Sequence, residues 1–301
     1  MMKDRARLTT EKRNPRTRDI DRCSTLQIVD ILNAEDRRVA PAVARQRRAI
    51  ARAVDLIVDG FRRGGRLFYV GAGTSGRLGV LDAAECPPTF GTSPRMVQGI
   101  IAGGRRALVR AVEGAEDRET DGAAAVDRKR MRSADVLVAI AACGLTPFVH
   151  GAVRRARERG ARTVFLTCAP EARRFIRADV VINPVVGPEA VTGSSRLKAG
   201  TATKLVLNTL TTAAMVRLGK VYGNLMVDLT VTNEKLRDRA ERIVMNVTGL
   251  GRRQARAVLA RADGRAKVAI LMHLGGFGRE EARKRLAECD QSLRRALSQE
   301  S

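Results

Sequence analysis

The sequence has very few aromatic residues: tryptophan is absent, and there are two tyrosines and seven phenylalanines in 301 residues. It therefore lacks the row of aromatic side chains on which proteins stack single-stranded nucleic acid. No run of eighteen apolar residues occurs, so we expect no membrane-spanning helix. The N-terminus is charged and has no apolar stretch behind it, so we expect no secretory signal.

Cysteine and histidine are also scarce. The five cysteines are an odd number, and no two of them are spaced as CxxC. This pattern predicts a reduced, cytoplasmic protein with neither a disulfide framework nor a zinc site. The chain contains only two histidines, His150 and His273, which argues against a cysteine nucleophile activated by histidine.

Acidic residues are outnumbered by basic ones, 32 against 56, which gives a formal charge of +24. A charge of this size is typical of nucleic-acid-binding proteins. The basic residues are spread along the chain, however, and no helix-turn-helix or zinc-finger spacing occurs. We therefore expect no specific nucleic-acid partner, and interpret the charge as a solvated surface that attracts anions in general.

Hydrophobic residues make up 44% of the chain, enough for a substantial core. Helix-like and strand-like patterns alternate, with helices expected at 39–61, from Arg77, at 118–130 and at 147–159, and strands at 66–70, 96–101, 136–142, 163–168 and 180–186. This order predicts an α/β fold, a doubly wound parallel sheet flanked by helices.

Three parts are expected along the chain. Residues 1–48 comprise a polar arm, extended over 1–22 and punctuated by Pro15, followed by the start of a helix. Residues 49–239 form the α/β domain, and 240–301 form a small C-terminal helical appendage.

The first candidate loop is 71–77 (GAGTSGR), which follows a strand and opens a helix. It matches the GxGxxG dinucleotide pattern, but that reading requires an acidic residue after the next strand, which ends in Ala102-Gly103-Gly104. Thr74 and Ser75 instead place hydroxyls beside the free N–H groups of a helix start, an arrangement suited to a phosphate monoester. An ordinary glycine turn is the alternative.

Two further loops, 143–147 (CGLTP) and 192–198 (TGSSRLK), also put glycine or hydroxyl residues before a helix. Singly, each is commonly just an N-cap. Together, at the ends of strands or the starts of helices, they predict a crevice lined with donors. The candidate binding residues are Gly73, Thr74, Ser75, Cys143, Gly144, Thr146, Ser194, Ser195 and Lys198.

Carboxylates lie between these loops in the sequence, at Glu85, Glu113 and Glu116. An acidic residue on a helix is usually solvated. Glu85 differs because it precedes Cys86 and two prolines, which we interpret as a rigid stop to the helix.

Seven motifs occur in order: GAGTSGR at 71–77, DAAECPPT at 82–89, IAGG at 101–104, EGAED at 113–117, TGSSRLKAGTATK at 192–204, NLMVD at 224–228 and TNEKL at 232–236. The set resembles the N-acetylmuramic acid 6-phosphate etherases, lyases of the sugar isomerase (SIS) superfamily, which are related to the glucokinase regulatory protein. The resemblance implies cleavage of a D-lactyl ether to give N-acetylglucosamine 6-phosphate and D-lactate, as in amino-sugar catabolism and peptidoglycan recycling. It also implies a cytoplasmic homodimer that needs no metal or other cofactor.

The resemblance places the two catalytic acids at Glu85, which would protonate the lactate oxygen, and Glu116, which would remove the proton on carbon 2. The residues themselves do not fix that order. The family's second loop reads Ser-Gly-Arg-Thr-Pro, whereas Cys143 and Leu145 here supply a weaker donor and remove a cation. A non-catalytic, sugar-phosphate-binding regulator of a kinase is therefore the alternative function. The stretch 247–270 resembles a small ubiquitin-associated-type fold.

Overall fold

The computed structural model describes residues 5–229, 231 and 233–298. Thr232, the first residue of the TNEKL motif, lies outside the described residues. The chain forms two compact units, one containing residues up to 84 together with 95–211, the other containing 85–94 and the residues from 212 onward.

The first unit is built on a five-stranded sheet in the order β2-β1-β3-β4-β5, with every neighbouring pair parallel. Its strands are β1 (Leu67–Gly71), β2 (Val97–Ile101), β3 (Val136–Ile140), β4 (Arg162–Leu166) and β5 (Val180–Ile182). All residues of β1 and β3 are buried, as expected for central parallel strands that are covered on both faces. The predicted doubly wound parallel sheet is confirmed.

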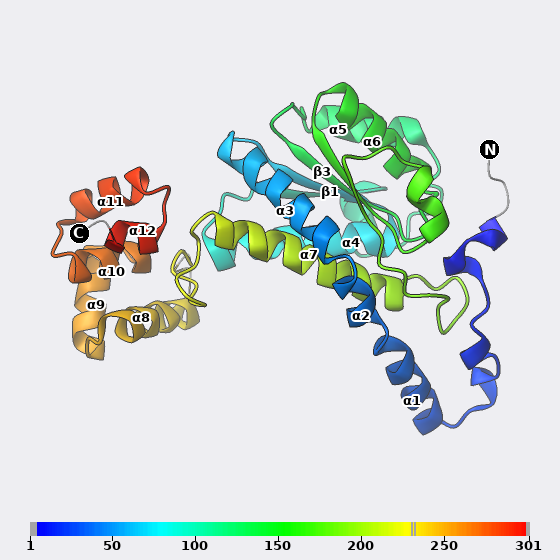
Figure 1. Cartoon of the computed structure of the whole chain (residues 1–301), viewed down its shortest axis with the longest axis horizontal. Helices are drawn as coiled ribbons and strands as arrows, with labels where there is room; N and C mark the ends of the chain where they lie inside the picture. The colour runs from blue at the N-terminus through cyan, green and yellow to red at the C-terminus, as the bar shows by residue number, and fades with distance from the viewer. Residues whose placement is uncertain (1–4, 230, 232, 299–301) are drawn as a thin grey trace. The chain divides into compact units, whose positions relative to one another are not determined.

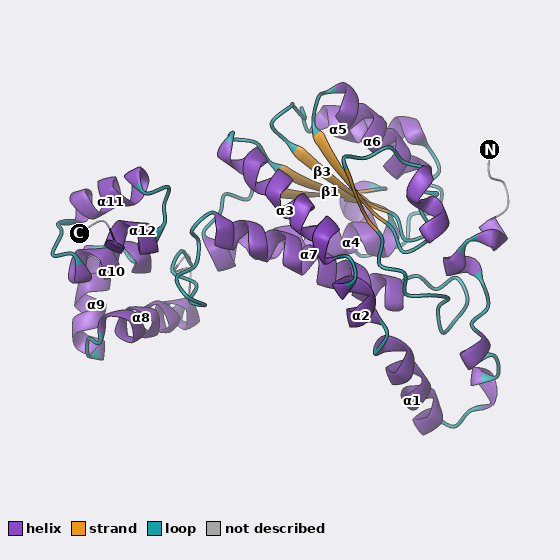
Figure 2. Ribbon diagram, in the orientation of Figure 1, coloured by secondary structure: helices purple, strands orange, loops and turns teal. Residues whose placement is uncertain are grey.

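Helices cover both faces of this sheet (Figures 1 and 2). On one face, α5 (Glu119–Arg128) and α6 (Pro147–Glu158) pack against Phe68, Val70 and Leu137. On the other face lies α3 (Arg47–Arg62), which contacts β1, β3 and β5. The remaining helices that belong wholly or partly to this unit are α1 (Thr25–Asp36), α2 (Val39–Ala44), α4 (Gly73–Phe90) and α7 (Lys198–Arg217).

Two glycines allow α5 and α6 to touch backbone to backbone. A Cβ on Gly122 would lie 1.8 Å from the Phe148 carbonyl oxygen, and one on Gly151 would lie 1.9 Å from the Glu119 carbonyl oxygen. Any larger residue at either position would push the helices apart. This contact fixes the first turn of α6 against the start of α5.

Three expectations about helix limits were wrong. The predicted helix at 39–61 is two helices, because the chain leaves helical geometry at Gln46, whose side chain accepts a hydrogen bond from Asn183 N at 3.0 Å. The helix after the first loop begins at Gly73 rather than near Arg77. It also runs through Pro87 and Pro88 to Phe90 instead of ending at the prolines.

The N-terminal arm is folded into four short 3-10 turns, η1 (Arg5–Arg7), η2 (Thr9–Glu11), η3 (Pro15–Thr17) and η4 (Ile20–Arg22), so the expectation of an extended arm was wrong. Leu8 and Thr10 are buried. Asn14 and Thr17 donate side-chain hydrogen bonds to the carbonyls of Pro188 and Ala190, at 3.2 and 2.8 Å. The arm therefore packs along the segment that leads into the third loop.

In the second unit, residues 234–298 form five helices: α8 (Glu234–Thr248), α9 (Arg252–Arg261), α10 (Ala266–Leu274), α11 (Arg279–Glu288) and α12 (Leu293–Ser298). α10 is apolar on nearly all sides, and its residues from Ala266 to Met272 are buried. Lys267 is the one charged residue in this buried stretch. Its ammonium donates to the Asp228 carboxylate at 2.7 Å and to the carbonyls of Gly219 and Gln291. Asp228, from the NLMVD motif, thus anchors the central helix.

Candidate functional site

The strand order reverses between β1 and β3. The chain passes from β1 to β2 on one side and then returns to β3 on the other. Gly71 at the end of β1 is in register with Ile140 at the end of β3, so the first and second loops leave the sheet side by side. A reversal of this kind is where doubly wound sheets bind their ligands.

The first loop is very short because α4 begins at Gly73, which has a left-handed φ of +52°. Gly76 N donates to Ala72 O at 3.3 Å. The N–H groups of Gly73, Thr74 and Ser75 therefore precede the hydrogen-bonded ladder of α4 and point out of its start, where an anion is stabilised.

The third loop lies against the first. Gly200, in the first turn of α7, has no side chain, and a Cβ there would lie 3.5 Å from Thr74 Cγ2 and 3.6 Å from Ser195 O. Thr74, Ser75, Ser194 and Ser195 are each half-buried. The structure therefore places the first turn of α7, directly after the third loop, against Thr74 of the first loop.

The second loop turns at Gly144, which has a φ of +78°, and leads to Thr146, the N-cap residue of α6. The Thr146 side chain makes no capping hydrogen bond. Cys143 and Leu145 pack against an apolar cluster formed by Leu8, Ala169 and Ala172. The two positions that depart from the family pattern thus face the N-terminal arm.

The EGAED segment lines a cavity of about 220 Å³ together with the first loop. Its lining residues are Ala72, Gly73, Arg77, Ala102, Ala107, Ala111, Val112, Glu113, Gly114, Ala115, Glu116 and Asp117. The Glu116 carbonyl accepts a hydrogen bond from Phe148 N at 2.9 Å, in the first turn of α6. Glu116 is thereby fixed to the helix that follows the second loop.

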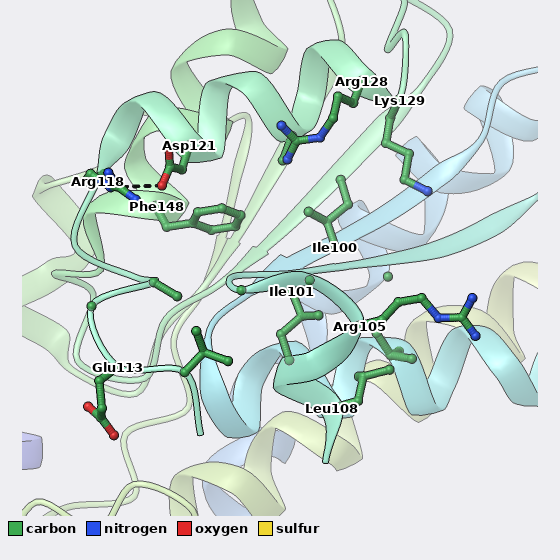
Figure 3. A pocket seen from close by; sticks show the side chains of 18 residues that line it. Ile100, Ile101, Arg105, Leu108, Glu113, Arg118, Asp121, Arg128, Lys129 and Phe148 are labelled. Carbon is green, nitrogen blue, oxygen red and sulfur yellow. Dashed lines mark ion pairs between the residues drawn. The ribbon is translucent and has the colours of Figure 1, made fainter. Parts of the chain in front are cut away.

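A second cavity, of about 890 Å³, lies beside the edge strand β2 (Figure 3). It is lined by apolar side chains such as Ile100 and Phe148 and by Arg105, Arg128 and Lys129. Arg118 and Asp121 form an ion pair of 3.0 Å at its wall. The two cavities share residues 112–115, so that segment separates them.

Lys198 takes a different position from the other predicted binding residues. Its ammonium is 1% exposed and donates to the Glu35 carboxylate and to Pro188 O. Burial raises the pKa of Glu35, but hydrogen bonds from Arg16, Lys198 and Asn14 outweigh it and lower the pKa to about 2. Lys198 thus ties the start of α7 to α1 and the N-terminal arm.

Glu189, also buried, accepts hydrogen bonds from the backbone N–H groups of Lys198 and Ala199, at 3.0 and 2.9 Å. Burial is the main cause that raises the pKa of this carboxyl, and these bonds oppose it. Two of the free N–H groups at the start of α7 are therefore already bound by the Glu189 carboxylate.

Glu85 lies on an exposed turn of α4, in the second compact unit. Three residues before it in the same motif, Asp82 is buried and accepts hydrogen bonds from Tyr69 Oη at 2.8 Å and Thr211 Oγ1 at 3.3 Å. The motif therefore combines a structural carboxylate with an accessible one.

Sequence reasoning missed two residues at this site. Arg77, the last residue of the first motif, lines the smaller cavity and donates from Nε to Leu108 O at 3.1 Å. His150 lies one helical turn into α6, and its Nε2 donates to Gly144 O at 2.8 Å, which supports the second loop. The sequence does offer a signal for Arg77, which is the only cation in its motif. It offers none for the hydrogen bond between His150 and Gly144.

These features define the class of fold: a doubly wound α/β domain with its glycine and hydroxyl loops at the strand-order reversal. The model of the glucokinase regulatory protein N-terminal SIS domain matches residues 49–157. The phosphoheptose isomerase of Neisseria gonorrhoeae has a similar structure, with a TM-score of 0.47 and 20% identity over 63% of this chain and 98% of its own.

Relatives of higher identity define the family more narrowly. The N-acetylmuramic acid 6-phosphate etherase of Trichormus variabilis is 54% identical over 90% of this chain and 88% of its own length. That of a Synechocystis species is 51% identical over 90% and 89%. The chain belongs to the N-acetylmuramic acid 6-phosphate etherase family, which confirms the resemblance. Among the described residues, no helix is both long and apolar enough to cross a membrane.

Proposed function

We propose that this protein cleaves the D-lactyl ether of N-acetylmuramic acid 6-phosphate, giving N-acetylglucosamine 6-phosphate and D-lactate. The observation that carries the proposal is the shared lining of one cavity by Glu116 and by Gly73, at the anion-binding start of α4. This shared lining supports a carboxylate acting beside the phosphate site that we propose at the start of α4. The family membership supplies the identity of the sugar.

The chemistry explains why carboxylates are needed. An alkyl ether resists direct hydrolysis, but in the open-chain sugar the aldehyde at carbon 1 acidifies the proton on carbon 2. Glu116 removes that proton, and Glu85 protonates the ether oxygen as the bond from carbon 3 to oxygen breaks, so D-lactate leaves. Water then adds its oxygen to carbon 3 of the unsaturated aldehyde, and a proton returns to carbon 2.

The 6-phosphate lies far from the reacting carbons, so its binding supplies orientation rather than chemistry. Its donors in this proposal are the N–H groups and hydroxyls of Gly73–Ser75, the side chains of Cys143 and Thr146 in the second loop, and the hydroxyls of Ser194 and Ser195. The Gly144 N–H is not among them, because it donates to Ala141 O at 3.0 Å within the turn. In this proposal Lys198 does not bind the phosphate itself, because its ammonium is paired with Glu35. It holds the third loop in place instead.

The test compares D-lactate release from N-acetylmuramic acid 6-phosphate by the wild type, Glu116→Gln and Glu113→Gln. Glu113 lines the same cavity and is therefore a matched control. We expect Glu116→Gln to lower kcat by roughly 10²–10⁴-fold, with Glu113→Gln close to wild type. Tight sugar-phosphate binding without lactate release would favour the non-catalytic kinase regulator instead.

We propose in addition that the protein is a cytoplasmic homodimer. The five cysteines are all present as thiols, which supports a reducing compartment. The family resemblance supports the dimer. A sedimentation mass near that of one 32.7-kDa chain would contradict it.

A further inference from the structure

The smaller cavity has an unusual balance of charge for the substrate we propose. Three carboxylates line it, those of Glu113, Glu116 and Asp117, and Arg77 is the one cation among its described lining residues. The lactyl group to be removed carries a carboxylate of its own. Without a cation, that carboxylate would have to approach the glutamate that acts as base against electrostatic repulsion.

Arg77 is held in a fixed orientation inside this cavity. Its Nε donates to Leu108 O at 3.1 Å, and its Nη2 donates to Arg110 O at 3.5 Å. The edge of the planar guanidinium formed by Nε and Nη2 is therefore hydrogen-bonded to the segment that leads into EGAED. Nη1 has no hydrogen-bond partner among the residues that the structure describes, which leaves N–H donors for a ligand.

None of the described arginines that flank the EGAED segment between positions 105 and 118 lines this cavity, and Arg110 is exposed. Arg105 and Arg118 line the larger cavity (Figure 3), and Arg118 is paired there with Asp121. Arg106 is exposed and lines neither of these two cavities. Arg77 is thus the cation whose position suits an anion lying beside Glu116.

We propose that Arg77 binds the carboxylate of the lactyl group, and so selects ethers of hydroxy acids over uncharged ethers. This inference rests on the proposed function. A guanidinium that is already held on one edge loses little freedom when it pairs with a carboxylate on the other. The same contact orients the leaving oxygen while the proton on carbon 2 is removed.

The experiment compares two substrates: N-acetylmuramic acid 6-phosphate and its lactyl carboxamide, which has the same shape without the negative charge. For the acid, we expect Arg77→Gln to raise KM about 10- to 100-fold, the range for a hydrogen bond to a charged group. For the carboxamide, wild type and Arg77→Gln should have similar KM values. Arg106→Gln should match wild type on both substrates, and Arg77→Lys should retain part of the preference for the acid.

If Arg77→Gln raised KM equally for the acid and the carboxamide, the inference would be overturned, because Arg77 would then only support the loop. So would a weaker affinity of Arg77→Gln for N-acetylglucosamine 6-phosphate, a product that lacks the lactyl group. If Arg77→Gln does not fold, the wild type decides: equal KM values for acid and carboxamide would overturn the proposal. Failure of the wild type to release lactate at all would instead contradict the proposed function.

Discussion

At the scale of single residues, Cys143 and Leu145 distinguish the second loop of this chain. Both pack toward Leu8 and its apolar neighbours, so the N-terminal arm covers a loop that we propose contacts phosphate. The loop keeps the Gly144 turn and the Thr146 N-cap. What it lacks is a strong side-chain donor at position 143.

Replacing Cys143 by serine should therefore tighten substrate binding. A neutral hydrogen bond contributes about 0.5–1.5 kcal/mol, so KM should fall by a few-fold to roughly tenfold while kcat stays nearly constant. Steady-state kinetics on N-acetylmuramic acid 6-phosphate measures this, with Cys23→Ser as the control. An unchanged KM would place the loop away from the phosphate, and lost turnover would give the thiol a chemical role.

At the scale of elements, the start of α7 is held by contacts that no local pattern reveals. Lys198 and Glu35 are 163 positions apart, yet they form a buried pair. In the same way, Gln46 lies at the break between α2 and α3 and accepts a hydrogen bond from Asn183 N, 137 positions away. The strands and their order in the chain follow from local apolar runs, but these helix limits depend on distant partners.

Lys198→Met should destabilise the protein by about 3–5 kcal/mol, because it leaves the Glu35 carboxylate buried with one cation fewer. The double variant Lys198→Met/Glu35→Leu removes both charges and should recover most of that loss. Thermal and urea unfolding of the purified variants measures both changes. Unaltered stability in the single variant would show that the ammonium is free to serve a ligand.

The lowered pKa of Glu35 also predicts a dependence on pH. Its pKa of about 2 in the folded chain lies below the ordinary value of 4.5, so the folded state binds fewer protons than the unfolded state between these values. The stabilisation, roughly 3 kcal/mol, is present above pH 4.5 and is lost as the pH falls toward 2. The stability difference between wild type and Glu35→Gln should therefore shrink over that range. A difference that stays constant with pH would contradict this assignment.

At the scale of the whole molecule, the seven motifs and the alternation of strands and helices were sufficient to predict the family and the sheet. The reversal of strand order explains why loops so far apart in sequence meet: β1 and β3 end in register. The proposed role of Arg77 was not predictable, because its hydrogen bonds to the carbonyls of Leu108 and Arg110 join α4 to a segment about thirty positions further along the chain. The place of Glu85 in the site remains a proposal from the family pattern.

The central claim, elimination of lactate followed by addition of water, is tested most directly by turnover in ¹⁸O-labelled water with mass analysis of both products. The account predicts that D-lactate is released without label, since its oxygen comes from the ether. It predicts one ¹⁸O at carbon 3 of N-acetylglucosamine 6-phosphate, since water adds there. Label in the lactate, or no lactate release at high protein concentration, would contradict the account.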